Sequence, residues 1–305
     1  MLDAFAYQGC ITKHSAHPSL FLRLAPHHLD NPAKTPPTNP AVVLLHFWGG
    51  SNHTYQPLIT HLSRDFPIIV PSLRGWGTSS RPPDAEAYRT ADYATDIIAL
   101  LHTLSSDYPE VFANGVILVG HSMGAKIAQF MLTQKYQLPS FVRIKGLVLL
   151  APAPAGSFSL PPEMKEQQVH AYDTAASAEF VARNVLLGTP GAVDDTIVEE
   201  LVTDAIAGSK GARVAWPEYG MSEELGGEVA RAVRDHRERE GALRVLVVVG
   251  ELDVVETVAS VMERTVNELS ASGATVEVHI IPGIGHLSPA EAPRVVADAI
   301  RSFLV

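Results

Sequence analysis

Short apolar runs alternate with helical patterns along most of this chain. The runs are rich in Val, Ile and Leu, a composition typical of strands that are buried on both faces of a parallel sheet. They predict strands at residues 41–45, 66–70, 116–119, 146–151, 243–249 and 275–281. Apolar positions three and four residues apart predict helices from Thr90, which we expect to cap its helix, and at about 123–136, 256–270 and 288–304. This alternation predicts an α/β fold, a mostly parallel sheet flanked by helices.

The start of the last helix has a sequence signature of its own. Ser288 and Glu291 have the spacing of a capping box, in which each side chain accepts a hydrogen bond from the backbone N–H of the other residue. Pro289 fits the first helical position, where a backbone N–H is not needed. We therefore expect a capped helix from residue 288.

The middle of the chain has a different pattern. Residues 153–241 contain no further buried apolar run, and amphipathic pieces at 163–170, 175–186 and 193–206 predict short helices. We expect residues 1–152 and 242–305 to form one core domain. Residues 153–241 are expected to form a helical insertion over one end of the sheet.

The N-terminal region is weakly patterned. Residues 5–10 and 19–24 alternate enough to be edge strands, and the prolines of residues 30–40 predict a loop. Four histidines lie close together in the sequence, but their spacing among prolines fits no metal-binding pattern of a helix or strand. They are His14, His17, His27 and His28. We expect no metal site and no cofactor.

The strongest chemical signal lies where the strand at 116–119 meets the next helix. The sequence there is Gly120-His-Ser122-Met-Gly124. A buried strand that turns at once into a helix needs glycines on both sides of the turn, and the residue at its apex is held in a strained backbone. This pattern predicts a nucleophile elbow with Ser122 as the nucleophile.

A serine nucleophile needs a general base, and the base needs an orienting acid. Reactive groups of parallel sheets lie at the carboxyl ends of strands, so the loops after residues 249 and 281 are the places to search. Asp253 follows the first of these strands and His286 follows the second. We assign His286 as the base and Asp253 as the acid, with Glu251 as the competing acid, and expect His279 to face solvent or a helix.

An acyl-transfer site also needs two N–H donors for the oxyanion. The residue after the nucleophile supplies one, the backbone N–H of Met123. The loop after the strand at 41–45 is expected to supply the other, from Phe47 or Trp48, because Gly49 and Gly50 allow close approach of the backbone.

Composition narrows the possible partners. The formal net charge of −10 argues against nucleic acid and anionic membrane surfaces. Cys10 is the only cysteine, which excludes an intrachain disulfide. The chain starts without a secretory pattern, and no apolar run approaches the ~20 residues of a membrane span. We expect a cytoplasmic monomer or homodimer that acts on a small molecule.

The chain resembles serine hydrolases of the α/β-hydrolase fold, over residues 41–152 and 242–305. Five motifs carry the resemblance, in the order that the family has them: His46-Phe-Trp-Gly-Gly50, Arg74-Gly-Trp-Gly-Thr-Ser79, Gly120-His-Ser-Met-Gly124, Gly250-Glu-Leu-Asp253 and Gly285-His286. The family's first motif usually reads His-Gly-X-(Gly/Pro)-Gly. Here Phe47 replaces its first glycine, so the resemblance ranks Trp48 before Phe47 as the second oxyanion donor.

The resemblance also implies roles for other segments. His46 and the loop from Arg74 to Ser79 would be structural, and the insertion at 153–241 would be a cap that selects the substrate. Candidate walls of its pocket are Tyr172, Trp216, Tyr219 and Met221. Further polar residues that stand out are His53, Lys126 and His170. A capped site suits a small or medium, largely apolar substrate.

The expected reaction is hydrolysis of a carboxylic ester or lactone through an acyl-enzyme on Ser122. The same residues resemble those of carbon–carbon bond hydrolases, thioesterases, amidases, perhydrolases and hydroxynitrile lyases, which stay open as alternatives. Epoxide hydrolases and haloalkane dehalogenases are disfavoured because their elbow carries an aspartate. Hormone-receptor members of the fold, which bind rather than turn over a ligand, are a rival from another functional class.

Overall fold

A six-stranded parallel sheet forms the centre of the computed structural model, which describes residues 8–10, 21–23 and 38–304. The strand order is β4-β3-β5-β6-β7-β8. The strands are β3 (Ala41–Leu45), β4 (Ile68–Ile69), β5 (Val116–His121), β6 (Ile144–Leu150), β7 (Arg244–Gly250) and β8 (Thr275–Ile281). Each predicted strand of the sheet is present, although β4 keeps only two of the five residues expected. The α/β prediction is confirmed.

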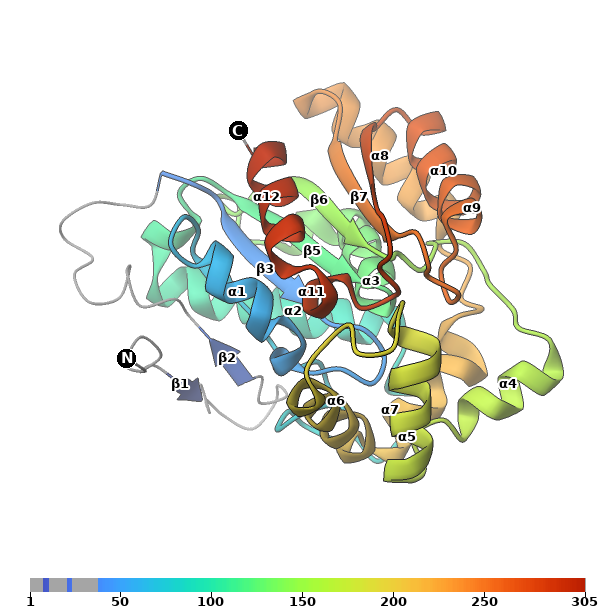
Figure 1. Ribbon diagram of the computed structural model, residues 1–305. Coiled ribbons are helices and arrows are strands. Elements are labelled where there is room, and N and C mark those ends of the chain that lie inside the picture. The colour runs from blue at the N-terminus through green and yellow to red at the C-terminus, as the bar shows by residue number, and fades with distance from the viewer. Residues whose placement is uncertain (1–7, 11–20, 24–37, 305) are drawn as a thin grey trace.

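Helices cover both faces of this sheet (Figure 1). The helices α1, α11 and α12 lie together on one face, and α2 and α3 lie on the other. The helices that precede β6 or follow β7 are α1 (Gln56–Leu62), α2 (Thr90–Asp107), α3 (Met123–Met131), α9 (Val258–Val261), α10 (Asn267–Ala271), α11 (Ser288–Glu291) and α12 (Pro293–Leu304). Shorter 3₁₀ turns are Asn52–Tyr55, Pro109–Phe112 and Leu132–Gln137.

Alternate residues of the strands enter two separate apolar cores. Val43 and Leu45 of β3 pack on the α2/α3 side, whereas Val42 and Leu44 pack on the α1/α12 side. Successive side chains of a strand point to opposite faces, so a strand covered by helices on both sides must be apolar at every position. This explains the continuous apolar runs of the sequence.

Between β6 and β7 the chain forms helices and turns without a strand, as expected. These helices are α4 (Pro162–Val169), α5 (Ala175–Val181), α6 (Asp195–Ala207), α7 (Lys210–Ala215) and α8 (Gly226–Glu240). The π-helical turns Ala182–Leu186 and Trp216–Gly220 continue α5 and α7, and a third, Met262–Val266, joins α9 to α10. We call residues 151–243 the insertion. Its last helix, α8, packs against α3 and α10, so the part that lies beyond the sheet is α4 to α7 (Figure 1).

Two predicted helix starts are wrong in detail. Thr90 does not cap α2: the helix begins at Thr90, whose N–H and hydroxyl both donate to the carboxylate of Glu223 in the insertion. The capping box of Ser288 and Glu291 does not form either. The Ser288 hydroxyl has no partner among the described residues, and Glu291 accepts from Leu287 and Gly285 instead.

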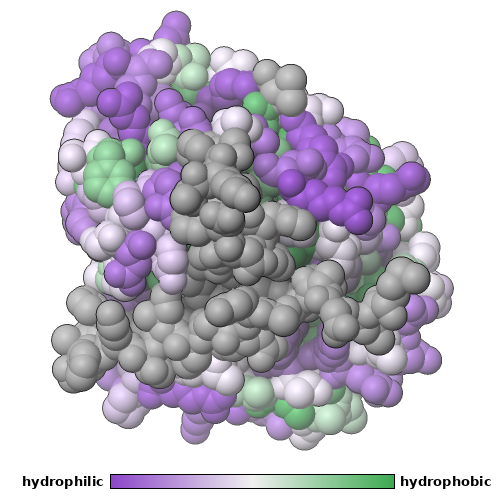
Figure 2. Space-filling model, turned by 90° about the vertical axis from the view of Figure 1, so that its left-hand side faces the viewer, coloured by the Kyte–Doolittle hydropathy of each residue, from purple (hydrophilic) through white to green (hydrophobic). Residues whose placement is uncertain are grey.

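Near the N-terminus, β1 (Gln8–Cys10) pairs antiparallel with β2 (Phe21–Arg23) as a separate two-stranded sheet. The remaining residues of the two predicted edge strands lie outside the described residues, as do His14, His17, His27 and His28. None of the described helices is both long and apolar enough to cross a membrane. On the face shown in Figure 2, hydrophobic residues outside the grey region form only small separate groups among hydrophilic ones.

Candidate active site

Ser122 occupies a strained turn between β5 and α3. Its φ is 53° and its ψ is −113°. Residues other than glycine rarely adopt a positive φ of this kind. A Cβ atom on Gly120 would lie 2.3 Å from the carbonyl oxygen of Gly124, and one on Gly124 would lie 2.1 Å from that of Leu45. Only glycine fits at either position, which explains the spacing of the motif.

Asp253 and His286 form a buried hydrogen-bonded pair. The Nδ1 atom of His286 lies 2.8 Å from Oδ2 of Asp253, and the two side chains are almost fully buried. The other carboxylate oxygen accepts from the N–H groups of Val255 at 2.8 Å and Glu256 at 2.9 Å. Burial raises the pKa of Asp253, but His286 and these N–H donors outweigh it and lower the pKa. The carboxylate therefore stays ionised and fixes the proton of His286 on Nδ1.

The pair lies against the turn that carries Ser122. His121, the residue before the serine, has Nε2 at 2.8 Å from the carbonyl oxygen of His286, and the two rings pack with centroids 5.1 Å apart. Burial, together with the nearby His286, lowers the pKa of His121 to about 3, so its ring is neutral and Nε2 carries the proton. His121, the second residue of the elbow motif, thus joins β5 to the loop after β8.

The loop of His286 is held from two directions. Its own N–H donates to the carbonyl of Leu186 in the insertion at 2.7 Å. The carboxylate of Glu291 accepts from Gly285 at 3.1 Å, from Leu287 at 3.2 Å and from Gly188 of the insertion at 2.8 Å. The sequence pointed to Glu291 only as part of a helix cap, because its partner Gly188 is about a hundred residues away.

The competing residues lie elsewhere. Glu251 is exposed, and its carboxylate accepts from the N–H of Gly283 at 3.0 Å. His279 is exposed on β8, at the edge of the sheet. Of the acids considered, the one that contacts His286 is Asp253.

The three backbone N–H groups predicted as oxyanion donors are those of Met123, Phe47 and Trp48. Met123 opens α3, so its N–H has no carbonyl one turn earlier in the helix. Among the described residues, the N–H groups of Phe47 and Trp48 donate no hydrogen bond either. The turn after them is closed by the N–H of Gly50 donating to Phe47 at 3.0 Å.

The Phe47–Trp48 corner is held by the insertion. The indole Nε1 of Trp48 donates to the carbonyls of Ala212 at 3.3 Å and Arg213 at 3.0 Å. The hydroxyl of Tyr172 donates to the Trp48 carbonyl at 3.1 Å, and the two rings lie 4.3 Å apart. The Phe47 side chain packs in an apolar cluster with residues of α5 and α6.

A third link joins the loop after this corner to α6. The Ser51 hydroxyl donates to Oδ2 of Asp204 at 2.6 Å, and Nδ1 of His53 lies 3.2 Å from Oδ1. His53 therefore belongs to the contact between the loop and the insertion. Asp204 could not be identified from the sequence, because it lies among the polar and apolar residues of an ordinary amphipathic helix.

The predicted pocket walls have different surroundings. Tyr172, Trp216 and Met221 are buried in the main apolar core. Tyr219 is partly exposed: its hydroxyl donates to the Ala85 carbonyl at 2.6 Å, and the Arg89 guanidinium lies 4.8 Å from its ring centroid. Contact of these four residues with a substrate stays a prediction. His170, one of the further polar residues that stand out in the sequence, is exposed and pairs with Asp173 and Glu166.

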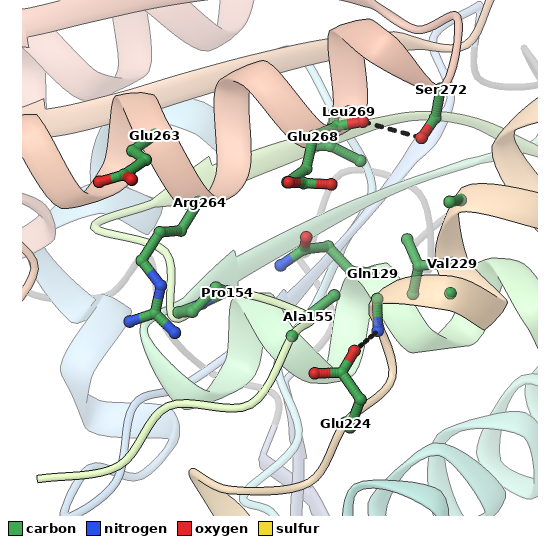
Figure 3. Close-up of a pocket in the computed structure, with 14 residues that line it drawn as sticks. Gln129, Pro154, Ala155, Glu224, Val229, Glu263, Arg264, Glu268, Leu269 and Ser272 are labelled. Carbon is green, nitrogen blue, oxygen red and sulfur yellow. Dashed lines mark hydrogen bonds between the residues drawn. The ribbon is translucent and has the colours of Figure 1, made fainter.

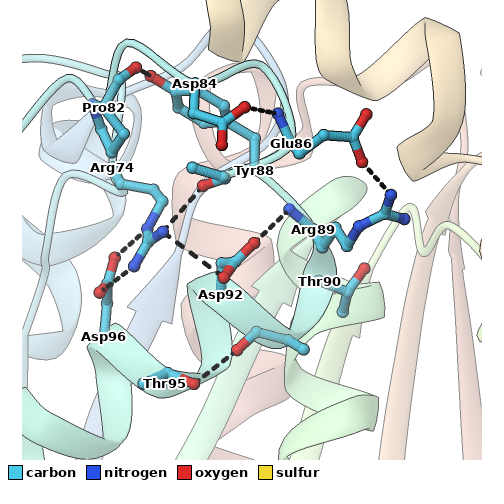
Figure 4. A network of polar contacts seen from close by, with 12 residues as sticks. Arg74, Pro82, Asp84, Glu86, Tyr88, Arg89, Thr90, Asp92, Thr95 and Asp96 are labelled. Atoms are coloured by element: carbon cyan, nitrogen blue, oxygen red, sulfur yellow. Dashed lines mark hydrogen bonds and ion pairs between the residues drawn. The ribbon is translucent and has the colours of Figure 1, made fainter.

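The predicted structural residues His46 and Arg74 are hydrogen-bonded, His46 fully buried and Arg74 partly buried. His46 has Nδ1 at 2.8 Å from the Phe47 carbonyl, its Nε2 accepts from the N–H of Leu73 at 2.9 Å, and burial lowers its pKa to about 4. Arg74 makes a two-pronged ion pair with Asp96 at 2.6 Å per contact and also donates to the Ala87 carbonyl (Figure 4). This network fixes the loop after β4 to α2.

A cavity of about 380 Å³ lies where the insertion meets α3 and α10 (Figure 3). Its walls include Gln129, Pro154, Glu224 and Arg264, and none of its lining residues is a predicted site residue. Among the described residues, no group of three or more His, Cys, Asp or Glu side chains is placed to hold a metal ion.

Comparisons with known proteins agree with this architecture. Two solved structures match over nearly their whole length: a bromoperoxidase from Bacillus anthracis, with TM-score 0.74, 17% identity and coverage of 98% of this chain and 99% of that one, and an esterase from Exiguobacterium antarcticum, with TM-score 0.71, 16% identity and coverage of 94% and 96%. At these identities the likeness concerns the fold.

Similarity to curated relatives is more local. A soluble epoxide hydrolase from a Corynebacterium species is 34% identical over 87 residues, which are 28% of this chain and 27% of the relative. The chain spans only about a quarter to a third of the length of the curated relatives that it matches. The family model described as "Alpha/beta hydrolase family", in contrast, matches residues 42–299. The chain therefore belongs to the alpha/beta hydrolase family.

Proposed function

We propose that this protein is a serine hydrolase that cleaves a carboxylic ester or lactone through an acyl-enzyme on Ser122. The observation that carries the proposal is the buried 2.8 Å bond between His286 and Asp253, beside a serine with φ of 53°. An ionised acid that orients a histidine close to a serine at a helix start is the arrangement that acyl transfer requires.

The steps follow from this arrangement. Nε2 of His286 takes the proton of the Ser122 hydroxyl as Oγ bonds to the substrate carbonyl carbon. The oxyanion then accepts hydrogen bonds from the N–H of Met123 and from that of Trp48, with Phe47 as the alternative donor. His286 returns the proton to the leaving alcohol as the C–O bond breaks. A water molecule, deprotonated by His286, then releases the acid and restores Ser122.

In this proposal α4 to α7 act as a cap over the serine, which is itself only 7% exposed. Apolar side chains gather on the side of the insertion that packs against the core, including Tyr172, Trp216 and Met221. A cap of this composition favours a small or medium, largely apolar substrate and keeps bulk water from the acyl-enzyme.

The relatives named epoxide hydrolases suggest a second reaction within the family. Opening an epoxide in the expected way needs a carboxylate nucleophile at the elbow, and this chain has Ser122 there. Ester or lactone cleavage is therefore the better-supported reaction.

The test is turnover of p-nitrophenyl esters of graded acyl length, with lactones and a 1,3-diketone assayed beside them. We expect Ser122→Ala to lower kcat by about 10³-fold or more on the best ester. Ser288→Ala is the matched control, because this buried hydroxyl has no partner among the described residues, and it should retain wild-type turnover. Wild-type turnover by Ser122→Ala would overturn the proposal.

A further inference from the structure

Lys126 lies one helical turn after Ser122 on α3 and is 1% exposed. A buried ammonium group is costly, and an apolar side chain of similar length would fill the same space at lower cost. Its pairing is unusual: among the described residues, no carboxylate lies within ion-pair distance of its Nζ atom. The group is instead surrounded by backbone carbonyls.

The three protons of the ammonium have three acceptors. Nζ donates to the carbonyls of Gly156 at 3.3 Å, Met221 at 3.1 Å and Glu223 at 2.7 Å. Gly156 belongs to the segment of the insertion that leads to α4, residues 153–160. Met221 and Glu223 belong to the segment that leads from α7 and its π-helical turn to α8, residues 221–225. We call these the entry connector and the exit connector.

The two connectors also bind one another. The N–H of Phe158 donates to Met221 at 2.9 Å, and that of Leu225 donates to Ala155 at 3.0 Å. The Glu224 carboxylate accepts from Ser157 at 2.8 Å. Figure 3 shows Pro154 and Ala155 of the entry connector and Glu224 of the exit connector on the wall of the cavity described above. The connectors therefore form one junction, and Lys126 holds it from the core side.

The acids nearest to Lys126 in the exit connector bind other groups. The Glu223 carboxylate accepts from Thr90 of α2, and that of Glu224 accepts from the N–H groups of Ser157 and Gly226. Burial lowers the pKa of Lys126 to about 8 against the opposing effect of these acids, so at pH 7 most molecules keep the charge. The ammonium group is thus left to the three carbonyls.

We infer that Lys126 is a positioning residue that fastens both connectors of the insertion to the helix carrying Ser122, and so sets how far the insertion can open over the serine. The second part of this inference rests on the proposed function, whereas the first part does not. Loss of the ammonium group should release the connectors locally while leaving the sheet intact.

The test is hydrogen–deuterium exchange of the whole protein, followed on peptides covering residues 153–160 and 219–226 and on peptides of β5 and β7. Lys126→Met removes all three donors at similar side-chain length. We expect exchange of both connectors to rise by about tenfold or more, with β5 and β7 unchanged. Lys126→Arg, which keeps charged donors, should restore part of the protection.

Lys135→Met is the matched control, because Lys135 follows α3 but pairs with Glu240 of α8, away from the connectors. It should leave the exchange of the connectors as in the wild type. If Lys126→Met does not fold, exchange of the connectors is measured in Lys126→Gln instead. Glutamine keeps N–H donors but lacks the charge. Unchanged exchange of the connectors, or a uniform rise over the whole chain, would overturn the inference.

Kinetics separate this inference from the proposed function. If the variant exchanges faster at the connectors and hydrolyses esters with a raised KM and a nearly unchanged kcat, both stand. Faster exchange in the variant, combined with a wild-type protein that turns over no ester, supports the fastening role and refutes the hydrolase proposal. Ester turnover by a Lys126→Met protein with unchanged exchange and KM refutes the fastening role alone.

Discussion

The two sides of the candidate site are built in different ways. On one side, Ser122, Asp253 and His286 follow the ends of β5, β7 and β8, and their loops are joined by the bonds of His121 to the His286 carbonyl and of His286 to Asp253. On the other side, the Phe47–Trp48 corner follows β3 but is held by α5 to α7 of the insertion. The difference implies that the reactive groups of the first side are placed by core strands and linked to one another, with the insertion contacting the loop of His286 through Leu186 and Gly188. The geometry of the second side depends on where the insertion lies.

The largest expected effect tests the core side. Asp253→Asn removes the charge that orients His286, while the side chain keeps its size and can still accept from Val255 and Glu256. We expect kcat on an active ester to fall by about 10³- to 10⁴-fold with little change in the insertion. Glu251→Gln is the control and should keep wild-type activity. Loss of activity in Glu251→Gln together with full activity in Asp253→Asn would instead assign Glu251 as the acid.

Acid stability tests how far the core side depends on burial. Burial lowers the pKa of His46 to about 4 and of His121 to about 3, whereas both would titrate near 6.5 in the unfolded chain. As the pH falls below 6.5, the unfolded state binds protons that the folded state excludes. The stability present above pH 6.5 is therefore lost towards pH 4, by about 2 kcal/mol between pH 6 and pH 5 for the two groups together.

Urea unfolding at a series of pH values measures this loss. His121→Gln removes one of the two groups, and its amide can still donate to the His286 carbonyl. The pH dependence of the free energy of unfolding should then weaken by about half of the histidine contribution. An identical pH dependence in the variant and the wild type would show that His121 is not held neutral in the folded chain.

A smaller effect is expected at the corner. Trp48→Phe removes the indole donor to Ala212 and Arg213 but leaves an aromatic ring to pack against Tyr172. The backbone N–H of residue 48 would lose its fixed position, and we expect kcat to fall about tenfold while the far-ultraviolet circular dichroism stays unchanged. A kcat equal to that of the wild type would mean that the insertion does not set this donor.

The smallest effect is expected from Tyr172→Phe. The change removes only the hydroxyl that donates to the Trp48 carbonyl, so we expect kcat to fall by roughly two- to fivefold. Tyr136→Phe, at an exposed position after α3, is the control and should have no effect. A loss larger than that of Trp48→Phe would indicate that Tyr172 contacts the substrate directly.

The same contrast explains what the sequence could predict. The elbow is local: Gly120 and Gly124 are needed because backbone atoms lie within 2.3 Å of where their Cβ atoms would be, and that need is visible in five consecutive residues. Asp253 and His286 could be found because parallel strands end at one edge of the sheet, which relates distant residues by a simple rule.

No such rule relates the insertion to the corner. Trp48 and Tyr172 are 124 residues apart, and Ser51 and Asp204 are 153 apart. Each of these residues has an ordinary local pattern, so only the folded chain shows the contact. The wrong predictions at Thr90 and Ser288 have the same cause, because contacts over long sequence distances replace the local caps. Thr90 donates to Glu223 of the insertion, and the Glu291 carboxylate accepts from Gly188 of the insertion.

The most direct test of the central claim is covalent labelling of Ser122 by a fluorophosphonate, followed by mass spectrometry of the intact protein and its peptides. The account predicts one adduct per chain, located on Ser122, formed much more slowly by Asp253→Asn and absent from Ser122→Ala. Absence of the adduct from the wild type, or equal labelling of Ser122→Ala, would contradict the claim that the core side of the site carries an activated serine.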